Sequence, residues 1–347
     1  MTDARRGVPG PRKVGLAEVP DPVVEKPTDA VVRIVAAGVC GSDLWQYRGL
    51  EPLPTGARMG HEFIGVVAAA GPEVRSVQPG DCVVSPFSYS DGECSACREG
   101  LFVSCAEGGV WGDPGTPGGA QAEAIRVPFA DATLVRLPVS GITGPDIRRF
   151  LPLADVLPTG HHAASLAAVG AGTGVVVIGD GPVAACACLA ARRLGAERVL
   201  VLGHHPSRLA VSRAVGAETA AVRSLEEAVE AVRGFFGGLA DVSLECVGTQ
   251  DAVDTALACV RDGGVLSYVG WPTAGVAIPL RSTFDRNISV RGGLAPARRY
   301  LPELLADVAA GVLDPSPVID AELSLEAAGD AYSVMDRRDV LKVCLRP

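Results

Sequence analysis

The sequence has no apolar run that approaches the roughly 20 residues of a membrane-spanning helix. Its first stretch, MTDARRGVPGPRK, also lacks the apolar core of a signal peptide. Lysine and arginine form no run or stripe, and the formal net charge is -9 at pH 7, which argues against nucleic acids and acidic membranes as partners. We therefore expect a cytoplasmic protein that binds neither nucleic acid nor membrane.

Aromatic residues are also scarce, at 5% of the chain, whereas hydrophobic residues reach 48%, which is typical of a globular protein with a large aliphatic core. A chain of 347 residues favours two domains, because single cores stop growing at roughly 250 to 300 residues. The 10 cysteines occur without an export signal, so metal binding or burial is favoured over disulfides. Those that lie in apolar segments are expected in the core: Cys82, Cys186, Cys188, Cys246, Cys259 and Cys344.

The pattern of the sequence changes along the chain. Residues 1–155 are rich in glycine and proline and contain short β-branched runs such as AVVRIVAAGV, which indicates an irregular, mainly β domain. In residues 156–294, VVVIGDGPVAACACLAARRLGA predicts a strand, a glycine-rich turn and a helix, and further strands and helices alternate after it. This alternation predicts an α/β fold with a doubly wound parallel Rossmann sheet. Residues 295–347 contain a helical segment and then VLKVCLRP, a predicted strand that can return to the first domain.

The turn after the first of these strands carries the fingerprint G-x-G-x-x-A, which is typical of dinucleotide-binding sites. Gly179 allows the tight turn, Gly181 lets the backbone approach a pyrophosphate, and Ala184 permits close packing of helix on strand. An ordinary glycine turn is the alternative. Other residues expected to contact the cofactor are Pro182 and Val183 in the fingerprint and Val269 at the end of the strand in GGVLSYVG.

The end of the second strand, LGHHPSR, bears on which dinucleotide binds. NAD sites usually carry an acidic residue there for the ribose 2'-hydroxyl, but this chain has Gly203. Glycine leaves room for a 2'-phosphate, His204 and His205 follow it, and Arg208 can clamp a phosphate with charge-assisted bonds. We therefore expect NADP(H) to be preferred over NAD(H). The alternative is that these are solvated loop residues and that NAD is tolerated.

Two groups of metal-binding residue types occur in the first domain. Cys40 in GVCGSD and His61 and Glu62 in GHEFIGVV supply the thiolate, imidazole and carboxylate that zinc accepts. The second group has the C-x2-C-x7-C spacing of a zinc knuckle and lacks the fourth ligand that a structural zinc needs: Cys94, Cys97 and Cys105.

The order and spacing of these motifs resemble those of the zinc-dependent alcohol dehydrogenases of the medium-chain dehydrogenase/reductase superfamily over nearly the whole chain. The matching pieces are GVCGSD, GHEFIGVV, PGD at 79–81, the cysteine segment, IGDGPVA and ECVG. The resemblance implies a mainly β, GroES-like catalytic domain formed by residues 1–155 and 295–347, with a Rossmann domain of residues 156–294 inserted into it. It also implies a homodimer or homotetramer.

The resemblance assigns roles to individual residues. Cys40, His61 and Asp155 match the ligands of a catalytic zinc, and Glu62 matches an adjacent acid that can swing onto the metal. Ser42 matches a hydroxyl that passes the proton of the alcohol toward solvent. Zinc lowers the pKa of the alcohol and hydride passes to the nicotinamide, so the expected substrate is a small alcohol or carbonyl compound.

The resemblance to this family also implies a fourth ligand for the zinc knuckle. The family's structural zinc motif has a cysteine where this chain has Asp91, so Asp91 is the implied fourth ligand beside the three cysteines. A carboxylate oxygen is a legitimate zinc donor. The alternative is a lobe without metal, held in shape by hydrogen bonds.

The chain departs from the family near the expected proton path, because some relatives carry a histidine where this chain has Trp45. Three tryptophans are candidates for the wall of the substrate pocket, with core packing as the alternative: Trp45, Trp111 and Trp271. His161 and His162 are explained by a helix start between the domains rather than by metal binding. Asp43 is expected to support the zinc site rather than to act as a base.

Two other functions are compatible with parts of this pattern. A reductase of activated C=C or C=N bonds belongs to the same superfamily and would turn over enones or iminium compounds but not simple alcohols. A nucleotide-binding protein that has lost catalysis is disfavoured, since it would have no reason to hold the full set of Cys40, Ser42, His61, Glu62 and Asp155.

Overall fold

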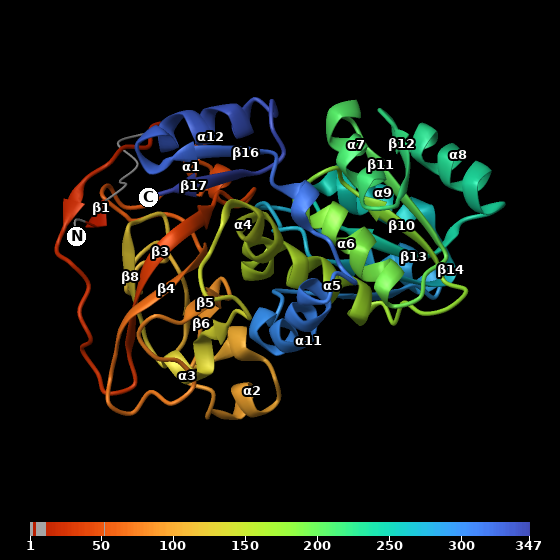
Figure 1. The fold of residues 1–347 in the computed structure, drawn as a ribbon. Helices are drawn as coiled ribbons and strands as arrows, with labels where there is room; N and C mark the ends of the chain where they lie inside the picture. The colour runs from red at the N-terminus through yellow and green to blue at the C-terminus, as the bar shows by residue number, and fades with distance from the viewer. Residues whose placement is uncertain (1–2, 5–11, 52) are drawn as a thin grey trace. The chain divides into compact units, whose positions relative to one another are not determined.

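The computed structural model describes residues 3–4, 12–51 and 53–347 of the chain (Figure 1). The chain divides into two compact units. Unit 1 consists of Met1–Asp155 and Pro296–Pro347, and unit 2 consists of Val156–Ala295. Unit 1 is therefore discontinuous in sequence. Nowhere in the described ranges does a helix combine the length and the apolar character that crossing a membrane requires.

Unit 1 is built on a sheet with the strand order β16-β17-β3-β4-β5-β9, and β8 also pairs with β3. Its long central strands, β3 (Ala30–Gly38) and β4 (Glu62–Ala70), are antiparallel partners with the apolar sequences AVVRIVAAG and EFIGVVAAA. Their inward side chains contribute to a buried core that includes Val32, Ile34 and Phe63. The late strand β17 (Val343–Arg346) pairs with β3 in antiparallel register and so joins the sheet of unit 1.

The other elements of unit 1 are short. The strands are β1 (Asp3–Ala4), β2 (Glu18–Val19), β5 (Cys82–Ser85), β6 (Ser88–Tyr89), β7 (Gly109–Val110), β8 (Ala124–Val127), β9 (Val135–Arg136) and β16 (Ala321–Ser324). The α-helices are α1 (Asp43–Tyr47), α2 (Ser95–Arg98), α3 (Ala130–Thr133), α4 (Gly144–Phe150), α11 (Ala297–Ala309) and α12 (Ala328–Asp336), and the 3-10 turns are η1 (Phe102–Ser104), η2 (Leu151–Ala154), η3 (Ser316–Val318) and η4 (Leu325–Ala327).

The β3–β4 pair brings the first group of candidate metal ligands together. Cys40 follows the end of β3, and His61 directly precedes Glu62, the first residue of β4. Gly38 and Glu62 are opposite each other in the antiparallel register, so the two segments meet at one end of the pair. A side chain at Gly38 would collide with the Glu62 carboxylate, and glycine is therefore required there. The buried turn η2, which ends just before Asp155, packs against β4.

Unit 2 is a six-stranded parallel sheet with the order β12-β11-β10-β13-β14-β15, which confirms the predicted doubly wound Rossmann fold. Its strands are β10 (Gly174–Ile178), β11 (Arg198–Gly203), β12 (Glu218–Ala221), β13 (Ala240–Glu245), β14 (Val260–Tyr268) and β15 (Ser289–Gly292). Its helices are α5 (Val156–Leu166), α6 (Pro182–Arg193), α7 (Pro206–Ala214), α8 (Leu225–Phe236), α9 (Gln250–Cys259) and α10 (Leu280–Asp285).

Helix α8 shows how the sequence sets the ends of these elements. The Ser224 hydroxyl accepts a hydrogen bond from the Glu227 N–H at 3.2 Å, which caps the first turn. The helix ends at Gly237, whose φ of 78° glycine adopts without the strain that a Cβ would add. Ala228 and Val232, one turn apart, are buried in the core of the sheet.

Five of the six cysteines expected in the core are buried: Cys82, Cys186, Cys188, Cys259 and Cys344. The expectation is wrong for Cys246, which is only partly buried because it lies just beyond the carboxyl end of β13. No disulfide joins any of the ten cysteines, all of which lie within the described residues.

Candidate functional site

The first candidate metal site, called here the buried cluster, consists of Cys40, His61, Glu62 and Asp155. Cys40 Sγ and His61 Nε2 lie 3.2 Å and 3.3 Å from Asp155 Oδ2. One potential ligand atom from each of the four residues lies within 4.8 Å of all the others. Ligands of one tetrahedral zinc lie about 3.3 to 3.8 Å apart when the metal–ligand bonds are about 2.0 to 2.3 Å, so the cluster has the dimensions of a single-ion site.

A chain of hydrogen bonds fixes the orientation of the cluster. Asp43 Oδ1 lies 3.3 Å from His61 Nδ1, and Asp43 Oδ2 accepts bonds from the Cys40 N–H at 2.9 Å and from Gln121 Nε2 at 3.3 Å. Gln121 Oε1 in turn accepts a bond from the Tyr332 hydroxyl at 2.9 Å. Asp43 contacts the ring nitrogen of His61 that is opposite to the one facing Asp155, so it holds the orientation of the imidazole without occupying the nitrogen that faces the cluster.

Lys342 places a positive charge against the cluster from the strand segment that returns to unit 1. Its Nζ lies 2.6 Å from Glu62 Oε1 and also donates to the carbonyl oxygen of Val39 at 3.3 Å. Both charged side chains are almost completely buried, with 1% and 0% of their surfaces exposed. A buried carboxylate needs such a partner because the cost of removing a charge from water is high.

The protonation of the cluster reflects its excess of acidic groups. Burial would lower the pKa of His61, but the negative charge of Asp43 and the hydrogen bond to Asp155 raise it well above its ordinary value. Burial and the nearby Asp155 carboxylate raise the pKa of the Cys40 thiol to about 11. Two protons are therefore held where several ligand atoms converge, which is the arrangement that a cation displaces when it binds.

The donor set fits zinc. Glu62 Oε2 is buried and has no hydrogen-bond partner among the described residues, so one oxygen of this acid is not satisfied by the protein. Thiolate, imidazole and carboxylate are ligands that zinc accepts in catalytic sites, which use three protein ligands and keep one position open. Cys40, His61 and Asp155 can provide the three ligands, with Glu62 beside them.

Ser42 and Trp45 lie next to this cluster in sequence. Ser42 caps the start of α1 and makes no hydrogen bond to the helix through its side chain. Trp45 is half-buried on α1, and the Arg48 guanidinium lies 5.3 Å from its ring centre.

Trp111 is part of the core of unit 1, so its tentative pocket assignment gives way to core packing. Its Nε1 donates to Ser85 Oγ at 3.1 Å and to the Pro86 carbonyl oxygen at 2.9 Å, and its ring packs against Phe63 and Tyr89. Trp271 belongs to unit 2 and is 43% exposed. The buried His161 pairs through Nε2 with Ser165 Oγ at 3.1 Å on its own helix, and neither it nor His162 belongs to the metal cluster.

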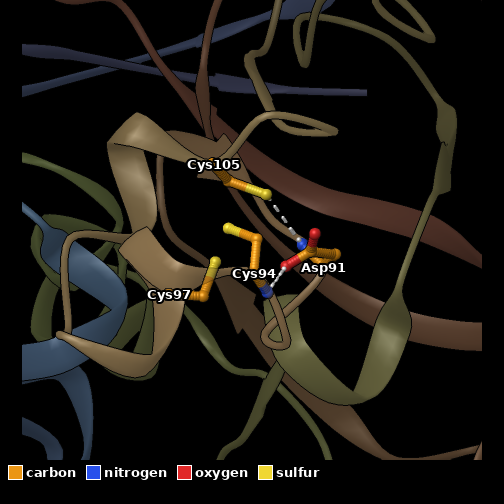
Figure 2. A group of neighbouring side chains, drawn as sticks. All are labelled: Asp91, Cys94, Cys97 and Cys105. Atoms are coloured by element: carbon orange, nitrogen blue, oxygen red, sulfur yellow. Dashed lines mark hydrogen bonds between the residues drawn. The ribbon is translucent and has the colours of Figure 1, made fainter.

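The second candidate metal site, called here the cysteine lobe, consists of Asp91, Cys94, Cys97 and Cys105 (Figure 2). One potential ligand atom from each lies within 4.8 Å of the others. Asp91 Oδ1 accepts bonds from the N–H groups of Glu93 at 2.8 Å and Cys94 at 3.0 Å, and the Asp91 N–H donates to Cys105 Sγ at 3.2 Å. The aspartate thus ties both ends of the segment together.

The acidic groups of the cysteine lobe differ in the direction in which their pKa values are shifted. Bonds from the N–H groups of Cys94 and Glu93 lower the pKa of Asp91, so it is ionised at neutral pH. Backbone N–H groups lower the pKa of Cys94, whereas burial raises the pKa of Cys97 to about 12. One thiol is therefore prepared to ionise, and another would need a cation beside it to do so.

The glycine-rich turn of unit 2 has the geometry that the fingerprint predicts. Gly179 has a φ of 121°, and its N–H donates to the Leu202 carbonyl oxygen at 2.9 Å, which joins β10 to β11. Gly181 caps α6, with Pro182 as its first residue. Val269, at the end of β14, donates its N–H to the Glu245 carbonyl oxygen at 2.9 Å.

The expectation that Gly203 leaves open space is wrong. A Cβ atom at Gly203 would lie 2.5 Å from the Cβ atom of Asp180, so the Asp180 side chain already fills this position. Asp180 also lies 2.8 Å from His205 Nδ1 and 3.8 Å from an Arg208 nitrogen. The side chains of His205 and Arg208 therefore both face an acid.

Comparison with known proteins defines first the class of this chain. Residues 26–139 match the model of the alcohol dehydrogenase GroES-like domain, and residues 182–310 match that of the zinc-binding dehydrogenase. A protein of this class combines a GroES-like domain with a Rossmann nucleotide-binding domain, which are the two folds observed here.

Full-length relatives then define the family. A zinc-type alcohol dehydrogenase of Aspergillus flavus is 33% identical over 97% of this chain and 79% of its own length. A probable zinc-binding alcohol dehydrogenase of Mycobacterium tuberculosis is 35% identical over 98% of this chain and 88% of its own length. The solved alcohol dehydrogenase TADH from Thermus sp. has a TM-score of 0.90 and 36% identity, with 99% of both chains covered. The chain belongs to the zinc-dependent alcohol dehydrogenase family of the medium-chain dehydrogenase/reductase superfamily.

Sequence reasoning missed four residues that the structure places at these sites. Lys342 was visible only as a lysine inside the apolar run VLKVCL, a signal for a buried charge that needs a partner. Asp180 was the variable residue between two fingerprint glycines. Gln121 and Tyr332 carried no recognisable signal, because their contacts with the Asp43 network span long stretches of sequence.

Proposed function

We propose that the protein is a zinc-dependent alcohol dehydrogenase or carbonyl reductase that transfers a hydride between NADP(H) and a small alcohol or the corresponding aldehyde or ketone. The observation that carries this proposal is the convergence of Cys40, His61, Glu62 and Asp155 at one end of the β3–β4 pair. Family membership supports the reaction class. The substrate within this class is set by pocket side chains that the fold does not specify.

Each residue of the buried cluster has a distinct task in this reaction. Cys40, His61 and Asp155 hold the zinc, which supplies Lewis acidity that lowers the pKa of an alcohol or polarises a carbonyl group. Glu62, anchored by Lys342, stays beside the metal as a further carboxylate. The hydroxyl oxygen of Ser42 accepts the proton of the alcohol and passes it toward solvent, and the same oxygen returns a proton in the reduction direction.

The dinucleotide binds at the glycine-rich turn of unit 2. Gly179 and Gly181 allow the backbone to approach its pyrophosphate, and the start of α6 favours the negative charge. The preference for NADP(H) rests on Gly203, which places no acid on β11, and on His205 and Arg208, whose side-chain nitrogens lie close to the same point. Saturation curves with NADPH and NADH test it, and equal affinity for both cofactors would contradict it.

The cysteine lobe holds a second, structural zinc with Asp91 as the fourth ligand. Two observations support this site: the four potential ligand atoms lie within 4.8 Å of one another, and Asp91 is ionised. Three thiolates and one carboxylate complete a tetrahedral site, which has no open position and therefore no catalytic task.

The protein forms homodimers or homotetramers in this proposal. Leu280 and Phe284 on α10 are 78% and 79% exposed, and they lie just before β15, the last strand of the parallel sheet. Such exposed apolar side chains beside a sheet edge suit contact with a second copy of the chain. Replacement of Phe284 by Glu should shift the mass in solution toward the monomer, and an unchanged mass would place the contact elsewhere.

Zinc per chain, measured by elemental analysis on protein purified without added metal, tests both metal sites together. Two zinc ions support the buried cluster and the cysteine lobe. One zinc ion that disappears in Cys40→Ser contradicts the second site only. No zinc in protein exposed to sufficient metal, together with turnover of enones but not of alcohols, contradicts the alcohol dehydrogenase proposal and favours a C=C or C=N reductase.

A further inference from the structure

The glycine-rich turn of unit 2 contains an acid to which the proposed reaction assigns no role, Asp180. It lies between Gly179 and Gly181, directly beyond the carboxyl end of β10. Because β10 and β11 are parallel neighbours, Asp180 and Gly203 lie side by side at the carboxyl ends of these strands. A Cβ atom on Gly203 would lie 2.9 Å from Asp180 Oδ2, so the carboxylate stands where an acid on β11 would begin. This is the point at which Rossmann folds read the ribose of the adenosine half.

Asp180 gathers the donors that surround this point. Its Oδ2 accepts hydrogen bonds from the N–H groups of His204 at 2.8 Å and His205 at 2.9 Å, and lies 2.8 Å from His205 Nδ1. Its Oδ1 lies 3.8 Å from Arg208 Nη1. Two backbone N–H groups at the start of α7, an imidazole and a guanidinium therefore converge on one carboxylate. The same kinds of donor bind phosphate oxygens in proteins.

The carboxylate is negatively charged at neutral pH. Burial would raise the pKa of Asp180, but the bonds from His205 and from the N–H groups of His204 and His205 lower it below its ordinary value. Only 11% of this side chain is exposed, so solvent screens its charge weakly.

We propose that Asp180 is a specificity-determining residue for the dinucleotide: it supplies, from the glycine-rich turn, the acid that is absent from the end of β11. Its carboxylate can accept a hydrogen bond from the 2'-hydroxyl of NAD(H). It repels the 2'-phosphate of NADP(H) and competes with it for the donors of His204, His205 and Arg208. Asp180 therefore limits a preference for NADP(H) that His205 and Arg208 would otherwise make strong.

This inference rests on the proposed binding of a dinucleotide at the glycine-rich turn. It differs from a purely structural role for Asp180 in one measurable respect. An acid that only shapes the turn would affect NADPH and NADH equally, since both carry the same pyrophosphate. An acid that faces the 2'-position changes the ratio of the two affinities.

The test is equilibrium binding of NADPH and NADH to the full chain and to Asp180→Asn, followed by protein fluorescence or calorimetry. The amide keeps the size of the side chain and an oxygen for the backbone N–H groups, but it removes the charge. The ratio of the NADH to the NADPH dissociation constant should rise by about tenfold or more, because a charge of like sign close to the phosphate is removed. Asp180→Glu, which restores the charge, should keep the ratio near that of the unaltered protein.

Asp241→Asn is the matched control. Asp241 is also in unit 2, also accepts a backbone N–H bond, from Gly174 at 2.8 Å, and also pairs with an arginine, Arg261 at 2.7 Å. Gly174 is the first residue of β10, whereas Asp180 follows the last one. The control therefore removes the same charge at the amino ends of the strands rather than at their carboxyl ends. Its ratio of dissociation constants should not change.

An unchanged ratio in Asp180→Asn, an equal loss of both cofactors, or a shift toward NADH would overturn the inference. Asp180→Ser provides a second neutral variant if the amide perturbs folding, and the same shift toward NADPH is expected from it. If the unaltered chain binds neither dinucleotide, the proposed function fails together with the inference. If it binds both and neither neutral variant shifts the ratio, only the inference fails.

Discussion

The two candidate metal sites of unit 1 use four residues each but are assembled in different ways. The buried cluster draws its members from the end of β3, the start of β4 and the residue after η2, so the whole sheet must form before they meet. The cysteine lobe takes all its members from the short segment between Asp91 and Cys105, and hydrogen bonds to the backbone hold that segment in shape. One site is a product of tertiary packing, and the other is a property of a loop.

The surroundings of the two sites also differ, since distant segments support the first site and the loop itself supports the second. Around the buried cluster, Asp43, Gln121 and Lys342 are themselves buried and set the charge and orientation of the ligands. In the cysteine lobe, Asp91 both ties the loop together and offers a ligand oxygen. The comparison teaches that removal of a residue from the buried cluster should change chemistry, whereas removal of one from the lobe should change stability.

The largest effect is expected from Cys40→Ser. Loss of the metal removes several kcal/mol of transition-state stabilisation, so turnover of an alcohol should fall by about a thousandfold or more, since each factor of ten corresponds to about 1.4 kcal/mol. Zinc content should drop by one ion per chain, while NADPH binding persists. Steady-state kinetics, elemental analysis and nucleotide titration measure the three outcomes.

Cys82→Ser is the control for this change, because Cys82 is a buried cysteine of unit 1 outside both clusters. It should retain the zinc and most of the activity. Full activity in Cys40→Ser would remove the buried cluster from the mechanism.

Lys342→Met should produce the largest loss of stability. The substitution leaves the fully buried Glu62 without its partner, and breaking one side of a buried ion pair costs about 3 to 5 kcal/mol. Chemical unfolding of unit 1, followed by circular dichroism, measures the change. The double variant Glu62→Gln with Lys342→Met should recover most of the lost stability, because no unpaired charge remains; a double variant as unstable as the single one would show that lost packing, not charge, is responsible.

Asp43→Asn should reduce activity less than Cys40→Ser does. The amide weakens the contact with His61 Nδ1 and perturbs the bond from Gln121, and such supporting residues typically contribute about 10- to 100-fold in metal affinity or activity. Zinc affinity, measured by competition with a chelator, should fall together with the turnover number. Asp29→Asn is the comparison, since Asp29 is equally buried but accepts bonds from the loop at Lys26. Equal effects of the two changes would contradict a specific role for Asp43.

The smallest effect on activity is expected from Asp91→Ala. It removes the fourth ligand of the cysteine lobe and two hydrogen bonds of the turn, so the chain should lose one zinc ion and about 1 to 3 kcal/mol of stability. Differential scanning fluorimetry should show a lower unfolding temperature, with the initial rate at low temperature nearly unchanged. The exposed side chain of Glu93 offers a control, Glu93→Ala, which should leave both zinc content and unfolding temperature unaltered. A large loss of activity in Asp91→Ala would show that the two sites are coupled.

The difference between the sites also explains what the sequence reveals. The spacing of Cys94, Cys97 and Cys105 is visible in one short segment, and so is the fingerprint at Gly179, because each pattern is contained in one continuous stretch of sequence. The alternation of apolar strands and helices likewise predicts the parallel sheet of unit 2, since its central strands β10, β11 and β13 are almost continuously buried and therefore apolar along their length. For these features, the position of a residue in the sequence is nearly sufficient to predict its place in the structure.

The residues that sequence analysis missed depend on contacts between distant segments. Glu62 could be assigned by its place beside His61, but its bond to Lys342 follows from the pairing of β17 with β3. Gly203 was interpreted from its own strand, whereas the side chain that fills its space comes from the adjacent one. A one-dimensional pattern does not contain such neighbour relations, which arise only once strands are placed side by side.

The ion pair of Lys342 with Glu62 also imposes an order on the synthesis of the chain. The lysine emerges 280 residues after its partner, and all of unit 2 is translated between them. At a translation rate of roughly 5 to 20 residues per second, Lys342 is synthesised on the order of 15 to 55 s after Glu62. The part of β3 that pairs with β17 lacks its partner strand for about the same time. Unit 2 is continuous and can fold on the ribosome during that interval. Unit 1 cannot be completed before it, so the nascent protein carries an unfinished sheet edge that chaperones, or other unfinished chains, can reach.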